Sequence, residues 1–176
     1  MKFKNSLSIF MFLLIFVASV KAQTSGDIKL QSATDKSQFI LSKQNGKYVA
    51  LHFLLKTECP YCIRHTSEYF GRAATLPNVV QVFIKPDTEK EIAEWATKLP
   101  AAELTKFPIY RDPDAKLATQ FNIPNGYSFH NQIVHYPALV LIGPDGKEVF
   151  RYIGKNNSDR FSFDQLVSKV NELSGK

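Results

Sequence analysis

The apolar run from Tyr48 to Leu55 constrains the fold of this chain more than any other feature. Its eight residues, YVALHFLL, include no acid, lysine or arginine, and Gly46 lies just before them. A strand that is apolar on both faces is typical of a sheet covered on both sides, most often with parallel neighbours. The run therefore predicts a central strand with helices on both faces of its sheet.

The rest of the chain alternates between strand and helix patterns. Apolar runs predict further strands over 79–84, 107–110, 137–142 and 147–152. The tetrapeptide Gly143-Pro144-Asp145-Gly146 predicts a hairpin turn between the last two. Helical spacing predicts helices over about 59–74, from 88 to 99, from Asp112-Pro113 onward, and from Ser162 to the C-terminus. We expect a loop over 124–136 and an α/β fold with a mixed central β-sheet.

Both cysteines of the chain lie in one motif, Cys59-Pro60-Tyr61-Cys62, between a predicted strand and a predicted helix. At a helix N-terminus the unpaired N–H groups and the helix dipole stabilise an anion. Thiols in such motifs have lowered pKa values, roughly 3.5–7.5. A thiolate at Cys59 would gain this stabilisation, with Cys62 one turn further into the helix. The placement favours thiol–disulfide chemistry.

Three other uses of the cysteine pair are less favoured. A purely structural disulfide across two residues closes a small loop and adds little chain-entropy stabilisation. Zinc sites usually need two more ligands at motif spacing, and there is no second such motif. Attachment of a c-type haem needs histidine after the second cysteine, where this chain has Ile63.

The first 22 residues read as a cleaved secretory signal rather than as part of the fold. Lys2 and Lys4 precede an apolar stretch from Leu7 to Val17, and small residues end at Ala22. The apolar stretch is shorter than the roughly 20 residues of a membrane-spanning helix, although an uncleaved anchor is the alternative. Cleavage predicts an exported protein, periplasmic or secreted. We then expect a lead-in over 23–45 and a redox domain over 46–176.

Signal cleavage also changes the meaning of the charge. The whole chain has 22 Lys and Arg, 16 Asp and Glu, and a net charge of +6. Losing the signal removes three lysines and no acid, which leaves 19 basic residues, 16 acidic residues and a charge of +3. The remaining basic residues form no cluster, so a nucleic-acid partner is not indicated.

Three segments taken together resemble the thioredoxin-fold redoxins. They are the strand–CPYC–helix segment, FPIYRDPDAKLATQFNI and HYPALVLIGPDGKEVFRYIGK. The last two are similar to exported thiol–disulfide oxidoreductases and their peroxiredoxin relatives. The resemblance implies a thioredoxin-like three-layer fold, with helices flanking a mixed sheet. It also implies an enzyme in which Cys59 is the nucleophile and Cys62 resolves the mixed disulfide.

The resemblance further implies supporting residues around the cysteines. Pro60 and Tyr61 lie between them, and Pro137 would follow a cis peptide bond opposite the motif. The backbone of Tyr136 would then face the cysteines and pair with an extended substrate segment.

Two departures from thioredoxins stand out: the strand before the motif has His52 but no acid, and Glu58 precedes the first cysteine. We expect His52 to be a buried, hydrogen-bonded residue, with proton transfer to Cys62 as the alternative. Glu58 would oppose thiolate formation at Cys59.

Two alternative functions remain open. The first is a peroxiredoxin-like peroxidase with Cys59 as the peroxidatic residue, Thr57 upstream and Arg111 or Arg151 supplying charge. The second is a copper carrier that uses the two cysteines with one of three histidines, namely His65, which we expect to face solvent, His130 or His135.

The predicted partners are protein thiols or disulfides and an upstream redox protein. A membrane is involved only if the signal is uncleaved. We expect a monomer and predict no cofactor and no metal site. The direction of electron flow is left open, because it depends on the reduction potential relative to the partners.

Overall fold

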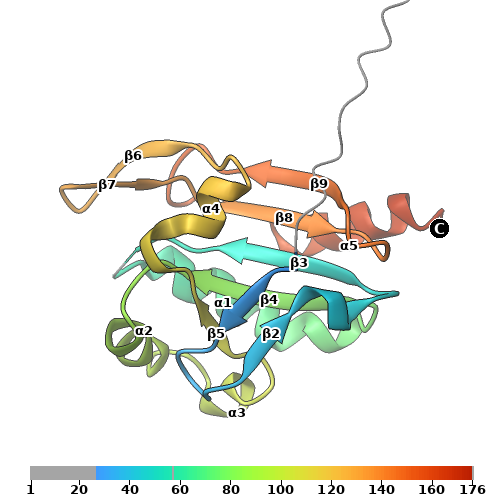
Figure 1. Cartoon of the computed structure of the whole chain (residues 1–176), viewed down its shortest axis with the longest axis horizontal. Helices are drawn as coiled ribbons and strands as arrows, with labels where there is room; N and C mark the ends of the chain where they lie inside the picture. The colour runs from blue at the N-terminus through green and yellow to red at the C-terminus, as the bar shows by residue number, and fades with distance from the viewer. Residues whose placement is uncertain (1–26, 57, 176) are drawn as a thin grey trace, which may run out of the picture.

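A computed structural model describes residues 27–56 and 58–175 of the chain. A five-stranded mixed sheet forms its centre, in the order β5-β4-β3-β8-β9 (Figure 1). The strands are β3 (Tyr48–Phe53), β4 (Val79–Lys85), β5 (Ile109–Arg111), β8 (Ala138–Ile142) and β9 (Glu148–Ile153). The α/β, thioredoxin-like architecture predicted from the sequence is confirmed.

The apolar run forms the central strand of this sheet. β3 pairs in parallel with β4 on one side and antiparallel with β8 on the other. All of its residues from Val49 to Phe53 are buried. The predicted turn at 143–146 joins β8 to β9, which pair antiparallel.

Two hydrophobic clusters cover the two faces of the sheet. Alternating residues of β3 divide between them, Ala50 on one face and Leu51 on the other. Helices α1 (Pro60–Arg72), α2 (Glu89–Ala96) and α5 (Phe163–Leu173) supply the first cluster. The N-terminal strands β1 (Lys29–Gln31) and β2 (Gln38–Ile40), the 3-10 turn η1 (Leu41–Gln44) and α4 (Lys116–Gln120) cover the other face. The sheet is therefore the middle of three layers.

Helix starts follow their capping chemistry. Thr88 and Glu91 form a capping box at the start of α2, and Ser162 and Gln165 form one at the start of α5, where the sequence predicts helices to begin. The segment after Asp112 begins instead with a 3-10 turn, η3 (Pro113–Ala115), so α4 starts only at Lys116. Two further short elements are η2 (Ala73–Thr75) and α3 (Ala101–Leu104).

Two segments differ from the sequence prediction. The predicted loop over 124–136 is a hairpin of β6 (Asn125–Phe129) and β7 (Gln132–His135), which extends beyond the sheet at the left of Figure 1. Its two turn residues, His130 and Asn131, both have left-handed φ angles, 48° and 60°, as a two-residue hairpin turn requires. The lead-in expected over 23–45 contains the β1–β2 hairpin and η1.

Within the described part of the chain, no helix has the length and apolar character needed to cross a bilayer. The predicted signal over 1–22 lies outside the described residues.

A substitution in the β1–β2 hairpin tests whether this hairpin stabilises the layer that covers one face of the sheet. Phe39 is 4% exposed and packs in the second cluster, with its ring centroid 5.9 Å from that of Tyr110. We expect Phe39→Ala to lower the free energy of unfolding by about 3–5 kcal/mol, measured by denaturant titration, because it leaves a cavity. Ile133→Ala, at a side chain that is 65% exposed, should stay within about 0.5 kcal/mol of wild type. Wild-type stability in the Phe39 variant would show that this hairpin does not cover the sheet.

Candidate active site

The two cysteines form a disulfide at the start of α1, with Cα atoms 5.1 Å apart. Cys59 is the N-cap residue of the helix, and Pro60 occupies its first turn. The backbone N–H of Cys62 donates to Cys59 Sγ at 3.1 Å. The local sequence explains this arrangement, because Cys59 has an extended backbone and Pro60 needs no intrahelical partner for its nitrogen.

Both sulfur atoms belong to buried residues. Cys59 is 1% exposed and Cys62 is 0% exposed. A cleft of about 590 Å³ reaches Cys59 but is not lined by Cys62. Its other walls come from α2 and its end (Trp95, Lys98), the turn of the β6–β7 hairpin (His130) and Asn157. A reaction partner therefore reaches Cys59 through this cleft.

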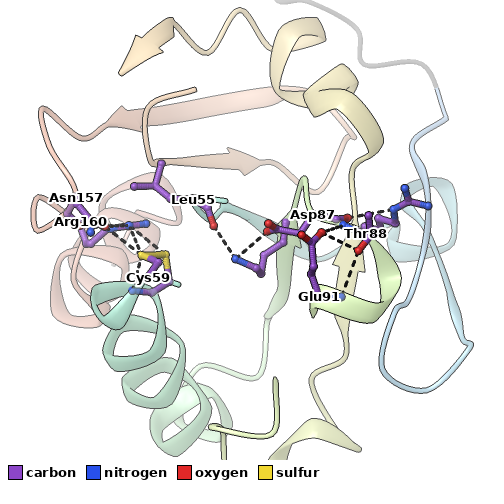
Figure 2. Close-up of polar contacts among 10 residues, drawn as sticks. Leu55, Cys59, Asp87, Thr88, Glu91, Asn157 and Arg160 are labelled. Carbon is purple, nitrogen blue, oxygen red and sulfur yellow. Dashed lines mark hydrogen bonds and ion pairs between the residues drawn. A yellow bond between two sulfur atoms is a disulfide. The ribbon is translucent and has the colours of Figure 1, made fainter. Parts of the chain in front are cut away.

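A loop near the C-terminus brings an arginine onto the disulfide (Figure 2). The Nη2 atom of Arg160 lies 3.3 Å from Cys62 Sγ and 3.5 Å from Cys59 Sγ. Arg160 also donates to the side-chain oxygen of Asn157 at 2.8 Å and to its backbone oxygen at 2.9 Å. Asn157 Oδ1 lies 3.1 Å from Cys59 Sγ. Neither residue is predicted from the sequence, because about 100 positions separate each of them from the cysteines.

The charge of Arg160 has no ion-pair partner at the site. Among the described residues, no carboxylate oxygen lies within 4.0 Å of its guanidinium. The nearby Asp159 instead bonds to the hydroxyl of Tyr152 and accepts from the backbone N–H of Lys155 at 2.8 Å. Burial lowers the pKa of Arg160 to about 10. It is therefore a positively charged group at neutral pH, beside two sulfurs that carry no charge in the disulfide.

The backbone of the loop over 154–160 is held tightly. The N–H of Gly154 donates to the carbonyl of Pro137 at 2.8 Å. A Cβ atom at Gly154 would stand 2.1 Å from the backbone oxygen of Asp159, so only glycine fits there. The N–H of Asn157 donates to the hydroxyl of Tyr127 at 3.0 Å, which ties the loop to the β6–β7 hairpin. These contacts fix the direction in which Arg160 points.

The expectation of a cis peptide bond before Pro137 is wrong. All peptide bonds among the described residues are trans. The Tyr136 N–H donates to the Pro124 carbonyl at 2.9 Å, and the Tyr136 carbonyl bonds with Nδ1 of His135 at 2.7 Å. Both backbone groups of Tyr136 thus have partners inside the protein. Pro137 instead anchors the loop that carries Arg160, because its carbonyl accepts the N–H of Gly154.

Two of the histidines, His52 and His65, form a buried hydrogen-bonded pair. His52 is buried and hydrogen-bonded, as expected, with Nδ1 at 3.0 Å from His65 Nε2 and Nε2 at 2.8 Å from Gln81 Oε1. The expectation that His65 faces solvent is wrong, since it is 7% exposed. Burial lowers the pKa of His52 to about 4 and also lowers that of His65, so both rings are neutral at pH 7.

A buried ion pair lies behind the motif, at the end of the central strands. Lys85 and Asp87 are both 0% exposed at the side chain, and Lys85 Nζ lies 3.1 Å from the Asp87 carboxylate. Lys85 also donates to the carbonyl of Leu55 at 2.6 Å, which holds the segment leading to Cys59 (Figure 2). Burial lowers the pKa of Lys85, and the charge of Asp87 opposes that shift. The pair carries no net charge, and its contribution to the site is the hydrogen bond that holds the Leu55 carbonyl.

The remaining predicted residues lie at the rim of the site or away from it. The Tyr61 ring is exposed, with the Arg64 guanidinium carbon 4.8 Å from its centroid. Glu58 is exposed and lies 3.7 Å from Lys98. Neither arginine considered for a peroxidase contacts the cysteines: Arg151 pairs with Glu148, and Arg111 donates to the backbone of Asp87. Thr57 lies outside the described residues.

The histidines considered for copper do not gather around the sulfurs. His65 bonds to His52, and His135 bonds to its neighbouring backbone, whereas His130 lines the cleft. The described part of the chain contains no group of three or more His, Cys, Asp or Glu arranged to hold a metal ion.

The fold and this site define a thioredoxin-like redoxin. The family model for the AhpC/TSA family matches residues 22–149, and the chain belongs to that family. Its bonded cysteine pair makes it an enzyme of the thiol–disulfide oxidoreductase class. A comparison with curated protein sequences gave no significant match.

Solved structures with the same fold include redoxins of several kinds. The exposed lipoprotein thioredoxin Etrx1 of Streptococcus pneumoniae is 20% identical, with a TM-score of 0.65 over 84% of this chain and 99% of that one. A cysteine-to-serine mutant of PrxQ from Xylella fastidiosa is 16% identical, with a TM-score of 0.65 over 84% and 89%. DsbF from MTB is 22% identical, with a TM-score of 0.63 over 84% and 95%. At these identities the likeness establishes the fold.

The buried histidine pair predicts an acid-sensitive fold. The unfolded chain binds a proton at His52 near pH 6.5, whereas the folded chain does so only near pH 4. Stability from this group is thus fully present above pH 6.5 and is lost as the pH falls toward 4. The loss should reach about 3 kcal/mol from His52, as seen in urea unfolding at a series of pH values.

His52→Gln should reduce the loss of stability between pH 6.5 and pH 4. His130→Gln, which removes a histidine from the exposed hairpin turn, serves as the matched control and should lose stability as wild type does. A wild-type loss of stability in His52→Gln would contradict the assignment of a buried neutral ring.

Proposed function

We propose that this chain is an exported thiol–disulfide oxidoreductase that exchanges disulfides with protein partners. One observation carries the proposal: the only two cysteines of the chain are bonded at the N-terminus of α1, where the cleft reaches one of them. A helix N-terminus stabilises a thiolate there.

The geometry distinguishes the two sulfurs. Cys59 lines the cleft and accepts the N–H of Cys62, whereas Cys62 is fully buried behind it. The residue that can meet a partner is also the one whose negative charge the helix stabilises. Cys59 is therefore the nucleophile and Cys62 the resolving residue.

In the reducing direction, the Cys59 thiolate attacks one sulfur of a substrate disulfide. The substrate S–S bond breaks, a Cys59–substrate disulfide forms, and the other substrate sulfur leaves as a thiolate. Cys62 then gives up its proton and attacks Cys59 Sγ, which releases the second substrate thiolate. The substrate has gained two electrons, and the chain has the Cys59–Cys62 disulfide. The same steps in reverse donate a disulfide to a partner dithiol.

A peroxidase function is the second candidate, because several solved structures with this fold are peroxiredoxins. In that reaction the Cys59 thiolate would attack one peroxide oxygen, the O–O bond would break, and the other oxygen would leave, after protonation, as water or an alcohol. Cys59 would then be a sulfenic acid, and the Cys62 thiol would condense with it to form the disulfide and release water. Arg111 and Arg151 lie away from the cysteines, and the positive charge that Arg160 places there suits either reaction. The pairing of Cys59 with Cys62 in one dithiol motif favours the first candidate.

Trapping tests the assigned roles. In Cys62→Ser the resolving thiol is absent, so we expect mixed disulfides between Cys59 and protein partners to accumulate. Non-reducing electrophoresis and peptide mass spectrometry would locate them. Cys59→Ser is the matched control and should give no adduct, because the cleft is not lined by Cys62.

Adducts at Cys62, or none in the Cys62→Ser variant, would contradict these roles. Turnover of insulin disulfides compared with consumption of hydrogen peroxide by wild type separates the two candidates. Peroxide turnover without disulfide turnover would favour the peroxidase.

Export is proposed from the N-terminal sequence alone, with a positive start, an apolar stretch and small residues up to Ala22. We expect the intact mass of the exported protein to correspond to a chain that begins at or near Gln23. A full-length mass recovered with the membrane fraction would contradict cleavage and indicate an anchor.

A further inference from the structure

Arg160 is a functional candidate that neither the motif nor the family match covers. It lies beyond residues 22–149, the segment that the AhpC/TSA model matches, and follows β9 in the loop over 154–160. Its guanidinium nevertheless reaches both sulfurs of the disulfide, at 3.3 and 3.5 Å. The loop contacts of Gly154 and Asn157 hold it there.

The charge balance of the site changes with its redox state. In the disulfide form, Arg160 is a partly buried cation that faces two neutral sulfurs and has no carboxylate within 4.0 Å among the described residues. Buried charges are stabilised chiefly by a partner of opposite sign. Reduction creates such a partner when Cys59 becomes a thiolate. Arg160 therefore stabilises the reduced form relative to the disulfide.

The other charged groups near Cys59 offset the charge of Arg160 only in part, through the neighbouring carboxylate of Asp159, which interacts with it electrostatically from beyond ion-pair distance. The exposed carboxylate of Glu58 is screened by solvent and lies 3.7 Å from Lys98. The buried Lys85–Asp87 pair has no net charge, and Asp159 is bonded to Tyr152. The other titratable groups around the site are the histidines and tyrosines and the Cys62 thiol: His52, His65, His130, His135, Tyr127 and Tyr152.

One contact opposes thiolate formation. The oxygen of Asn157 lies 3.1 Å from Cys59 Sγ and would accept a hydrogen bond from the thiol form. A hydrogen bond with a charged group is roughly twice as strong as a neutral one. The charge of Arg160 therefore outweighs this contact.

We propose that Arg160 is a catalytic residue that holds the Cys59 thiolate and raises the reduction potential of the Cys59–Cys62 pair, biasing the chain toward disulfide donation. The inference rests on the proposed oxidoreductase function and names the group that determines its direction. Because a more stable reduced form makes a stronger oxidant, removal of the charge should make the chain a better reductant.

The proton balance of the step follows. A partner dithiol supplies two electrons, the Cys59–Cys62 bond breaks, and the partner's own disulfide forms. Of the two protons that the partner loses, one goes to Cys62 and the other to solvent, because Cys59 stays a thiolate beside Arg160. Near neutral pH, reduction thus takes up one proton rather than two. The potential should then change by about 30 mV per pH unit, which for two electrons corresponds to a tenfold change in the equilibrium constant.

The test compares purified wild type with Arg160→Met, Arg160→Gln and Arg160→Lys. The pKa of Cys59 is read from thiolate absorbance at 240 nm, and the potential from equilibrium with reduced and oxidised glutathione. Arg160→Gln keeps an N–H donor but removes the charge, and Arg160→Lys keeps the charge. Arg64→Met, an exposed arginine on α1, controls for the loss of one positive charge.

We expect Arg160→Met and Arg160→Gln to raise the Cys59 pKa by about one unit and to lower the equilibrium constant for oxidising glutathione about tenfold. Arg160→Lys and Arg64→Met should stay within about twofold of wild type. If Arg160→Met does not fold, Arg160→Gln decides the question. A wild-type pKa and equilibrium constant in Arg160→Gln would overturn the proposal.

These readouts need no protein partner, so the two proposals can fail separately. If wild type does not turn over protein disulfides while the Arg160 variants shift as expected, the proposed function fails and the role of Arg160 as the group that stabilises the thiolate is retained. If turnover is normal and the variants do not shift, only the role of Arg160 fails.

Discussion

The site depends on one constraint: the two sulfur atoms lie between the start of α1 and the loop that follows the edge strand β9, at the end of the sheet where β3 also ends. α1 can start there because the central strand β3 ends a few residues earlier and Lys85 holds the carbonyl of Leu55. The covering loop can close because β8 and β9 are paired and the ladder continues from Pro137 to Gly154. The sheet thus brings together residues about 100 positions apart.

The electrostatics of the site follow from what this arrangement buries. The histidine pair beneath α1 is neutral, and the Lys85–Asp87 pair is balanced. The carboxylate nearest the motif in sequence, Glu58, is exposed to solvent beside Lys98. Arg160 and the N-terminus of α1 are the positive features that remain at the sulfurs. Both favour the reduced, anionic state of Cys59.

Local signals in the sequence predicted most of the fold. Apolar runs located the strands of the central sheet, and side-chain caps located the starts of α2 and α5. The sequence predicts a loop in place of the β6–β7 hairpin because the turn is His130-Asn131 rather than a glycine-containing pair, although both residues adopt left-handed φ angles. For a related reason α4 begins later than the sequence predicts, since Asp114 and Ala115 also have positive φ angles.

The site was only half predictable. The cysteine pair was evident because its spacing and its place between strand and helix are both local. Arg160 and Asn157 could not be identified, because only the tertiary fold brings their loop to α1. The predictions of a cis bond before Pro137 and of an exposed His65 are wrong. Both features depend on contacts with distant segments, because Pro137 bonds to Gly154 and His65 bonds to His52.

The reduction potential of the Cys59–Cys62 pair in the intact chain, measured against glutathione from pH 6 to pH 8, tests the central claim most directly. We predict reversible two-electron exchange, a potential above about −300 mV, and a slope near 30 mV per pH unit. A potential below about −300 mV, as is typical of structural disulfides, would contradict a redox-active pair. A slope near 59 mV per pH unit throughout would contradict a Cys59 thiolate stabilised at neutral pH.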